Sequence, residues 1–121
     1  MGGTILVVDD DPWVREVLVI ALASEGHEVL EAADGRDALE VLESRRPDLI
    51  LLDLMMPRMG GWEFVAELER RRLRSEIPIV VLSAAAHVPE QAARIGVEGY
   101  FSKPFELDAL LDEVSRLTQV C

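Results

Sequence analysis

Cysteine is almost absent from the chain: Cys121 is the only one, so no disulfide bond can form within the chain and nothing indicates an oxidising compartment. Long apolar runs are also absent. The stretch VLVIALA (residues 17–23) is far shorter than the roughly 18 residues that a membrane span needs. The start, MGGT, has no basic segment followed by an apolar one, so we expect no secretory signal. These absences predict a soluble cytoplasmic domain that has no membrane partner.

Basic residues are scarce as well. The chain has 12 lysines and arginines against 23 aspartates and glutamates, a net charge of −11. Such a charge repels nucleic acid over most of a surface, so we expect no direct nucleic-acid binding. The one basic run, at Arg70, Arg71, Arg72 and Arg74, lies where a helix is expected to end. Cations are favoured there by the helix dipole, and we interpret the run as a solvated face.

What the chain does have is a set of short apolar runs, each followed by a polar group. Runs of this kind, bounded by turn signals, are typical of buried parallel strands. ILVV (residues 5–8), LILL (49–52) and IVVL (79–82) are the clearest, and a shorter one near residues 98–101 precedes the only lysine. The polar groups that follow the runs are Asp9, Asp10, Asp11, Asp53, Ser83 and Lys103.

Helical patterns separate these runs. Asp11 and Asp34 are expected to cap two helices, and Gly26 and Pro47 to end them. A further strand is expected over residues 28–32, a third helix from Trp62 to about residue 73, a weaker helix over 89–95 and a last helix after 106. The apolar residues of the first and third helices are Val14, Val17, Leu18, Ala21 and Leu22, and Trp62, Phe64, Val65 and Leu68.

Alternating strands and helices predict an α/β three-layer sandwich with a five-stranded parallel sheet. A chain of 121 residues is the size of one domain. With a short edge strand at residues 28–32, the flavodoxin-like strand order 2-1-3-4-5 is the natural choice. Its ligand crevice lies between the first and third strands, where Asp9 to Asp11 and Asp53 would meet.

The chemistry of these groups favours phosphoryl transfer. Clustered carboxylates repel one another unless a cation holds them together, and Mg²⁺ binds through one or two carboxylates and a backbone carbonyl. Asp53 could then attack a phosphorus atom, while the metal and Lys103 neutralise charge and Ser83 donates a hydrogen bond. The sequence therefore predicts an aspartyl phosphate at Asp53.

Four motifs in order resemble the receiver domain of two-component response regulators, of the chemotaxis-regulator kind, over essentially the whole chain. They are ILVVDDDP (residues 5–12), DLMMP (53–57), VLSA (81–84) and GYFSKPF (99–105). The first motif implies that Asp10 binds Mg²⁺ directly and Asp9 indirectly. The second implies that Asp53 is the phospho-acceptor and a metal ligand, and that Met55 offers its backbone carbonyl to the metal.

The remaining two motifs concern the response to phosphorylation. The resemblance implies that Ser83 and Lys103 stabilise the phosphoryl group, that Ser83, Ala84 and Tyr100 form the switch, and that the bond before Pro104 is cis. It also implies that the donor is a sensor histidine kinase or a histidine phosphotransfer protein. The output is then a changed surface for an unknown protein target, so the domain is no enzyme beyond its own phosphorylation and dephosphorylation.

Other interpretations remain open at this point. The resemblance implies that residues 1–121 form one receiver domain, which we expect to be either a single-domain regulator or part of a longer protein. A phosphatase of the haloacid dehalogenase type also uses Asp and Mg²⁺, but it places its nucleophile after the first strand. A flavodoxin-like cofactor binder needs a phosphate loop where this chain has Asp9 to Asp11. Asp11 itself has a purely structural interpretation as a helix cap, and Tyr100 as a packing aromatic.

Overall fold

One parallel sheet of five strands forms the centre of the computed structural model, which describes residues 2–54, 59–73, 77–83, 97–102 and 105–118. The strands pair in the order β2-β1-β3-β4-β5, which confirms the predicted flavodoxin-like order. Their bounds are β1 (Thr4–Val8), β2 (Glu28–Ala32), β3 (Leu49–Asp53), β4 (Ile79–Ser83) and β5 (Gly99–Ser102).

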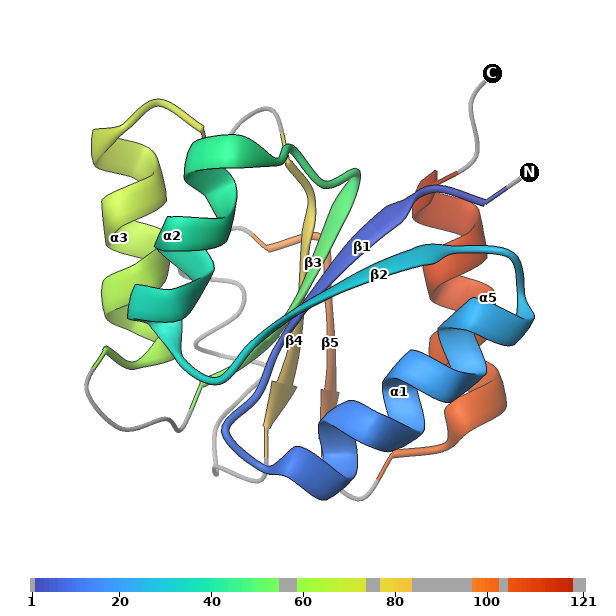
Figure 1. Ribbon diagram of the computed structural model, residues 1–121. Coiled ribbons are helices and arrows are strands. Elements are labelled where there is room, and N and C mark those ends of the chain that lie inside the picture. The colour runs from blue at the N-terminus through green and yellow to red at the C-terminus, as the bar shows by residue number, and fades with distance from the viewer. Residues whose placement is uncertain (1, 55–58, 74–76, 84–96, 103–104, 119–121) are drawn as a thin grey trace.

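Helices cover both faces of the sheet. Figure 1 shows α2 and α3 on one face and α1 and α5 on the other, so the predicted three-layer sandwich is confirmed. The helices are α1 (Pro12–Ser24), α2 (Gly35–Ser44), α3 (Gly61–Arg70) and α5 (Leu107–Thr118). The helix expected over residues 89–95 lies outside the described residues. Among those described, no helix is both long and apolar enough to cross a bilayer.

The sheet separates two apolar cores, because successive side chains of a strand point to opposite faces. Leu6, Ile50 and Val81 pack with the apolar faces of α2 and α3. Ile5, Leu49 and Val80 pack with those of α1 and α5. All five residues of β3 and of β4 are buried, as expected for runs that are apolar on both faces.

Helix ends follow the signals in the sequence. Asp11 caps α1 by accepting a hydrogen bond from the Trp13 N–H, and Asp34 caps α2 by accepting one from the Asp37 N–H at 2.9 Å. Gly26 follows α1 with φ of 90°, a conformation that glycine adopts without strain. Of the apolar residues named for α1, Leu18 and Leu22 are buried against the sheet, whereas Val17 is exposed.

The end of α3 differs from the prediction. The helix was expected to reach about residue 73 but ends at Arg70, because Arg72 takes a left-handed conformation with φ of 61°. The Leu73 N–H then donates to the Leu68 carbonyl at 2.8 Å, and the Arg72 N–H donates to the Glu69 carbonyl at 3.0 Å. This is the Schellman pattern, and it turns Leu73 back against the core.

Two arginines of the basic run pair with an acid on their own helix. The Arg70 Nε–H donates to Glu67 at 2.9 Å and the Arg71 Nε–H donates to Glu67 at 2.8 Å. These hydrogen bonds, from Arg70 first and then from Arg71, lower the pKa of Glu67 to about 2. Both contacts fit the interpretation of the run as a solvated face.

Arg72→Gly is expected to be more stable than Arg72→Ala by about 1 kcal/mol in unfolding free energy, because only glycine adopts the left-handed conformation without strain. Both variants remove the same side chain, so their difference isolates the backbone effect. Urea unfolding of the two proteins measures it. Equal urea midpoints for the two variants would show that the backbone at residue 72 is not strained by a side chain.

Candidate functional site

Three carboxylates meet at the carboxyl edge of the sheet. Val8 of β1 is in register with Leu52 of β3, so the next residues of the two strands, Asp9 and Asp53, lie side by side. Asp10 follows Asp9, and each of the three acids has a carboxylate oxygen within 4.8 Å of the others'. The predicted convergence of acids from the first and third strands is therefore present in the fold.

Burial differs among the three acids. Asp9 and Asp53 are buried at 1% and 4% exposure, whereas Asp10 is exposed. The Asp9 carboxylate accepts a hydrogen bond from the Asp11 N–H at 2.9 Å, which ties it to the loop. Of the two acids of this cluster that follow β1, Asp10 is therefore the one that is exposed to solvent beside Asp53.

This donor set fits a hard divalent cation. Three carboxylates supply oxygen ligands, and a cation among them offsets their mutual repulsion. The open side at Asp10 leaves room for the waters that Mg²⁺ usually retains. Asp9, Asp10 and Asp53 are the residues that would hold such an ion.

A glycine lets α3 start against the end of β3. The Gly61 N–H donates to the Leu54 carbonyl at 3.2 Å, and a Cβ on Gly61 would lie 2.7 Å from the Leu54 Cα and 2.9 Å from the Asp53 carbonyl oxygen. Backbone atoms this close leave no room for a side chain. Gly61 thus supports the backbone of Asp53, a role that the sequence analysis did not identify.

Ser83 and Tyr100 lie on the two strands that follow β3 across the sheet. Ser83 ends β4 and is fully buried, and its neighbour Leu82 is the register partner of Asp53. Tyr100 is in register with Val81, so it projects from the α2 and α3 side of the sheet, as Ser83 does. Tyr100 is 44% exposed, which argues against the interpretation as an ordinary packing aromatic.

The other predicted site residues, Met55, Ala84, Lys103 and Pro104, lie outside the described residues. Their assigned roles, including the cis bond before Pro104, stay predictions. The chain has two histidines. His27 Nδ1 accepts a hydrogen bond from the Gly3 N–H at 3.0 Å, and His87 lies outside the described residues.

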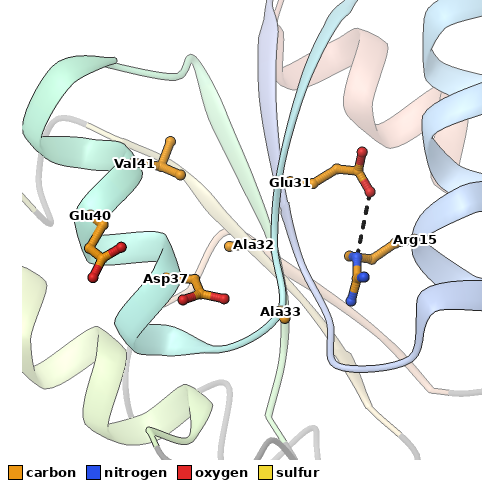
Figure 2. Close-up of a pocket in the computed structure, with 7 residues that line it drawn as sticks. All are labelled: Arg15, Glu31, Ala32, Ala33, Asp37, Glu40 and Val41. Carbon is orange, nitrogen blue, oxygen red and sulfur yellow. Dashed lines mark ion pairs between the residues drawn. The ribbon is translucent and has the colours of Figure 1, made fainter.

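Arg15 is a site residue that sequence reasoning missed. Its guanidinium donates to the Asp9 carbonyl at 2.6 Å and pairs with Glu31 of β2 at 3.5 Å. Arg15 and Glu31 both line a groove of about 540 Å³ over β2 between α1 and α2. Figure 2 shows them with the other residues that line it. The one available signal was the position of Arg15 four residues after the helix cap Asp11, one helical turn above the acidic loop.

Known proteins share both the sequence and the fold. Residues 5–115 match the response regulator receiver domain family. The phosphate regulon transcriptional regulatory protein PhoB of Pseudomonas aeruginosa is 42% identical over 98% of this chain and 54% of its own length. The chain spans about half the length of the curated relatives it matches.

Solved structures agree with this family. The response regulator TrrA of Thermotoga maritima, solved in complex with Mg²⁺ and BeF, has a TM-score of 0.84 and 34% identity, covering 97% of this chain and 99% of its own. The receiver domain of a sensor histidine kinase from Pseudomonas aeruginosa, with a magnesium ion coordinated in its active-site cleft, has a TM-score of 0.85 and 30% identity, covering 97% and 98%.

These matches do not favour the alternatives of a haloacid dehalogenase-type phosphatase or a flavodoxin-like cofactor binder. They agree with the acids after the first and third strands and with the strand order of the sheet. The chain belongs to the response regulator receiver domain family of two-component signalling systems.

Proposed function

We propose that the chain accepts a phosphoryl group on Asp53 and answers by changing a protein-interaction surface. The observation that carries this proposal is the convergence of Asp9, Asp10 and Asp53 within 4.8 Å at the edge of the sheet. The Mg²⁺ and BeF complex of the similar TrrA supports it, since it was formed by a regulator 34% identical to this chain.

In the proposed transfer, an Asp53 oxygen forms a bond to phosphorus while the N–P bond of a phosphohistidine breaks. The electron pair of that bond stays on the imidazole nitrogen, which takes up a proton. Asp10, Asp53 and the Met55 carbonyl would hold Mg²⁺ directly and Asp9 would hold it indirectly, and the bound ion would neutralise charge on the phosphoryl oxygens. Ser83 and Lys103 bind those oxygens. The domain catalyses only this reaction and the later hydrolysis of its own aspartyl phosphate.

A sensor histidine kinase or a histidine phosphotransfer protein is the proposed donor. A protein donor has to dock beside Asp53, and α1 leaves an exposed apolar stripe next to the acidic loop. Trp13 is 71% exposed and Ile20 is 64% exposed, with Val17 between them. Large apolar groups gathered on one exposed face favour contact with another protein.

The remaining proposals concern the setting of the domain. We propose one receiver domain over residues 1–121, acting in the cytoplasm on a protein target still to be identified. PhoB is by name a transcriptional regulator, and this chain covers 54% of it. The net charge of −11 supports the proposal that this domain itself does not contact nucleic acid.

Phosphorylation at Asp53 is tested with a small donor. Incubation with acetyl phosphate and Mg²⁺ is expected to add one phosphoryl group, read by intact mass, and Asp53→Ala is expected to abolish the addition because it removes the nucleophile. Asp108→Ala, which removes an exposed carboxylate of α5, serves as the control and should label like the parent. Labelling of Asp53→Ala at the parental level would contradict the assignment.

Mg²⁺ binding is expected in the absence of any phosphoryl group. Calorimetry should detect heat when Mg²⁺ is added to the parent. Asp10→Asn is expected to bind Mg²⁺ at least about tenfold more weakly, because the substitution removes a charged ligand. Asp48→Asn makes the same charge change at the opposite edge of the sheet, where Asp48 accepts from the Thr4 N–H. Equal affinities in the parent and Asp10→Asn would count against the site.

The switch is tested at Tyr100, the only tyrosine of the chain. Protein labelled with 3-fluorotyrosine should give one ¹⁹F signal. Addition of Mg²⁺ with beryllium fluoride is expected to move that signal and shield it from a paramagnetic probe in solvent, because the exposed ring turns inward. Ser83→Ala should weaken the response, since it removes the hydroxyl drawn to the phosphoryl group. A signal that stays unmoved in the parent would refute the role of Tyr100.

A further inference from the structure

Arg15 connects the acidic loop to the edge strand. It lies in the first turns of α1, and its guanidinium donates to the carbonyl oxygen of Asp9 at 2.6 Å. That carbonyl belongs to the peptide unit between Asp9 and Asp10. The same guanidinium pairs with Glu31 of β2 at 3.5 Å (Figure 2).

The contact of Arg15 with the Asp9 carbonyl restricts the direction in which the Asp10 side chain points. A peptide unit is planar, so a fixed carbonyl of Asp9 also fixes the N–H and the Cα of Asp10. The Asp9 N–H is held by the Ala32 carbonyl at 3.1 Å and the Asp9 carboxylate by the Asp11 N–H. Arg15 adds a side-chain contact to the peptide unit between Asp9 and Asp10.

Arg15 is itself held in place. Its side chain is 20% exposed, against 50% for that of Glu31, so the guanidinium sits in the wall of the groove while its partner faces solvent. A planar guanidinium can direct separate N–H groups at a carbonyl and at a carboxylate, which the single ammonium of lysine does less well. A surface pair of this kind is weak by itself, and its effect is to orient Arg15.

The contact that Arg15 makes with Asp9 and the positive charge of Arg15 are expected to have opposite effects on Mg²⁺ affinity. A positive group near three carboxylates reduces the electrostatic attraction for a metal ion, so the loss of Arg15 would strengthen Mg²⁺ binding if charge dominated. Loss of the contact to Asp9 would instead free the peptide before Asp10 and weaken binding. The sign of the change therefore separates the two effects.

We propose that Arg15 is a positioning residue that holds the Asp9–Asp10 peptide so that the Asp10 carboxylate faces Asp53, with Glu31 orienting Arg15. This inference rests on the proposed function, because it concerns the metal site formed by Asp10 and Asp53. It adds to the metal site a residue of β2, Glu31, which lies outside the acidic cluster.

Calorimetric titration with Mg²⁺ tests the proposal on the metal-free protein. Arg15→Ala is expected to weaken Mg²⁺ binding roughly tenfold, as is usual when a residue that orients a metal ligand is removed. Arg15→Lys should lie between the parent and Arg15→Ala, and Glu31→Gln should weaken binding less than Arg15→Ala. Arg36→Ala, which removes an exposed arginine at the start of α2, is the charge control and should bind like the parent.

Two further measurements separate positioning from a purely structural role. Amide chemical shifts of Asp10 and Asp11 in the metal-free protein should change in Arg15→Ala and stay unchanged in Arg36→Ala. Thermal unfolding shows whether each variant is folded, and a structural role alone would lower the midpoint but leave the Mg²⁺ affinity of the folded protein unchanged. If Arg15→Ala does not fold, the comparison of Arg15→Lys with the parent decides.

The outcomes are distinct. Equal or tighter Mg²⁺ binding by Arg15→Ala, or by Arg15→Lys where it replaces that variant, overturns the positioning role while leaving the proposed function intact. Absence of Mg²⁺ binding by the parent overturns the proposed metal site and this inference with it. Weaker binding with the loop shifts, and no change in Arg36→Ala, supports it.

Discussion

The pairing of β1 with β3 forces carboxylates together, and the site depends on this constraint. The register that places Val8 beside Leu52 also places Asp9 beside Asp53. The carboxylate oxygens lie within 4.8 Å of one another. At that separation two negative charges repel by on the order of 3–4 kcal/mol, for an effective dielectric constant of about 20. Full burial of one Leu, Ile or Val contributes about 1.5–3 kcal/mol, and every residue of β3 is buried. The apolar strands therefore supply the free energy that keeps the acids close.

The strands and their order could be predicted because they depend on local patterns. Residues 5–8, 49–52 and 79–82 are apolar without interruption, which indicates burial on both faces, and each observed strand lies within one residue of the predicted range. Once the order was assigned, the meeting of Asp9, Asp10 and Asp53 followed from topology alone. Helix caps at Asp11 and Asp34 were equally local, since each uses its own side chain on a nearby N–H.

Features that depend on tertiary contacts were missed. Arg15 contacts a backbone carbonyl and a residue on another strand, and no spacing in the sequence encodes either partner. Gly61 is required because α3 starts against the backbone of Asp53 and Leu54, a contact that arises only after folding. Arg72 adopts a conformation typical of glycine, so the end of α3 carried no glycine signal and its length was overestimated.

The sheet also separates two apolar cores, one on each face, whose side chains can change independently of each other. Leu51 of β3 lies in the core beneath α1 and α5, whereas its neighbour Leu52 lies in the core beneath α2 and α3. Substitutions that repack one side do not have to be matched on the other, because no side chain of β3 or β4 belongs to both cores. Relatives with this architecture can thus acquire new neighbours on one face while the opposite face is left unaltered.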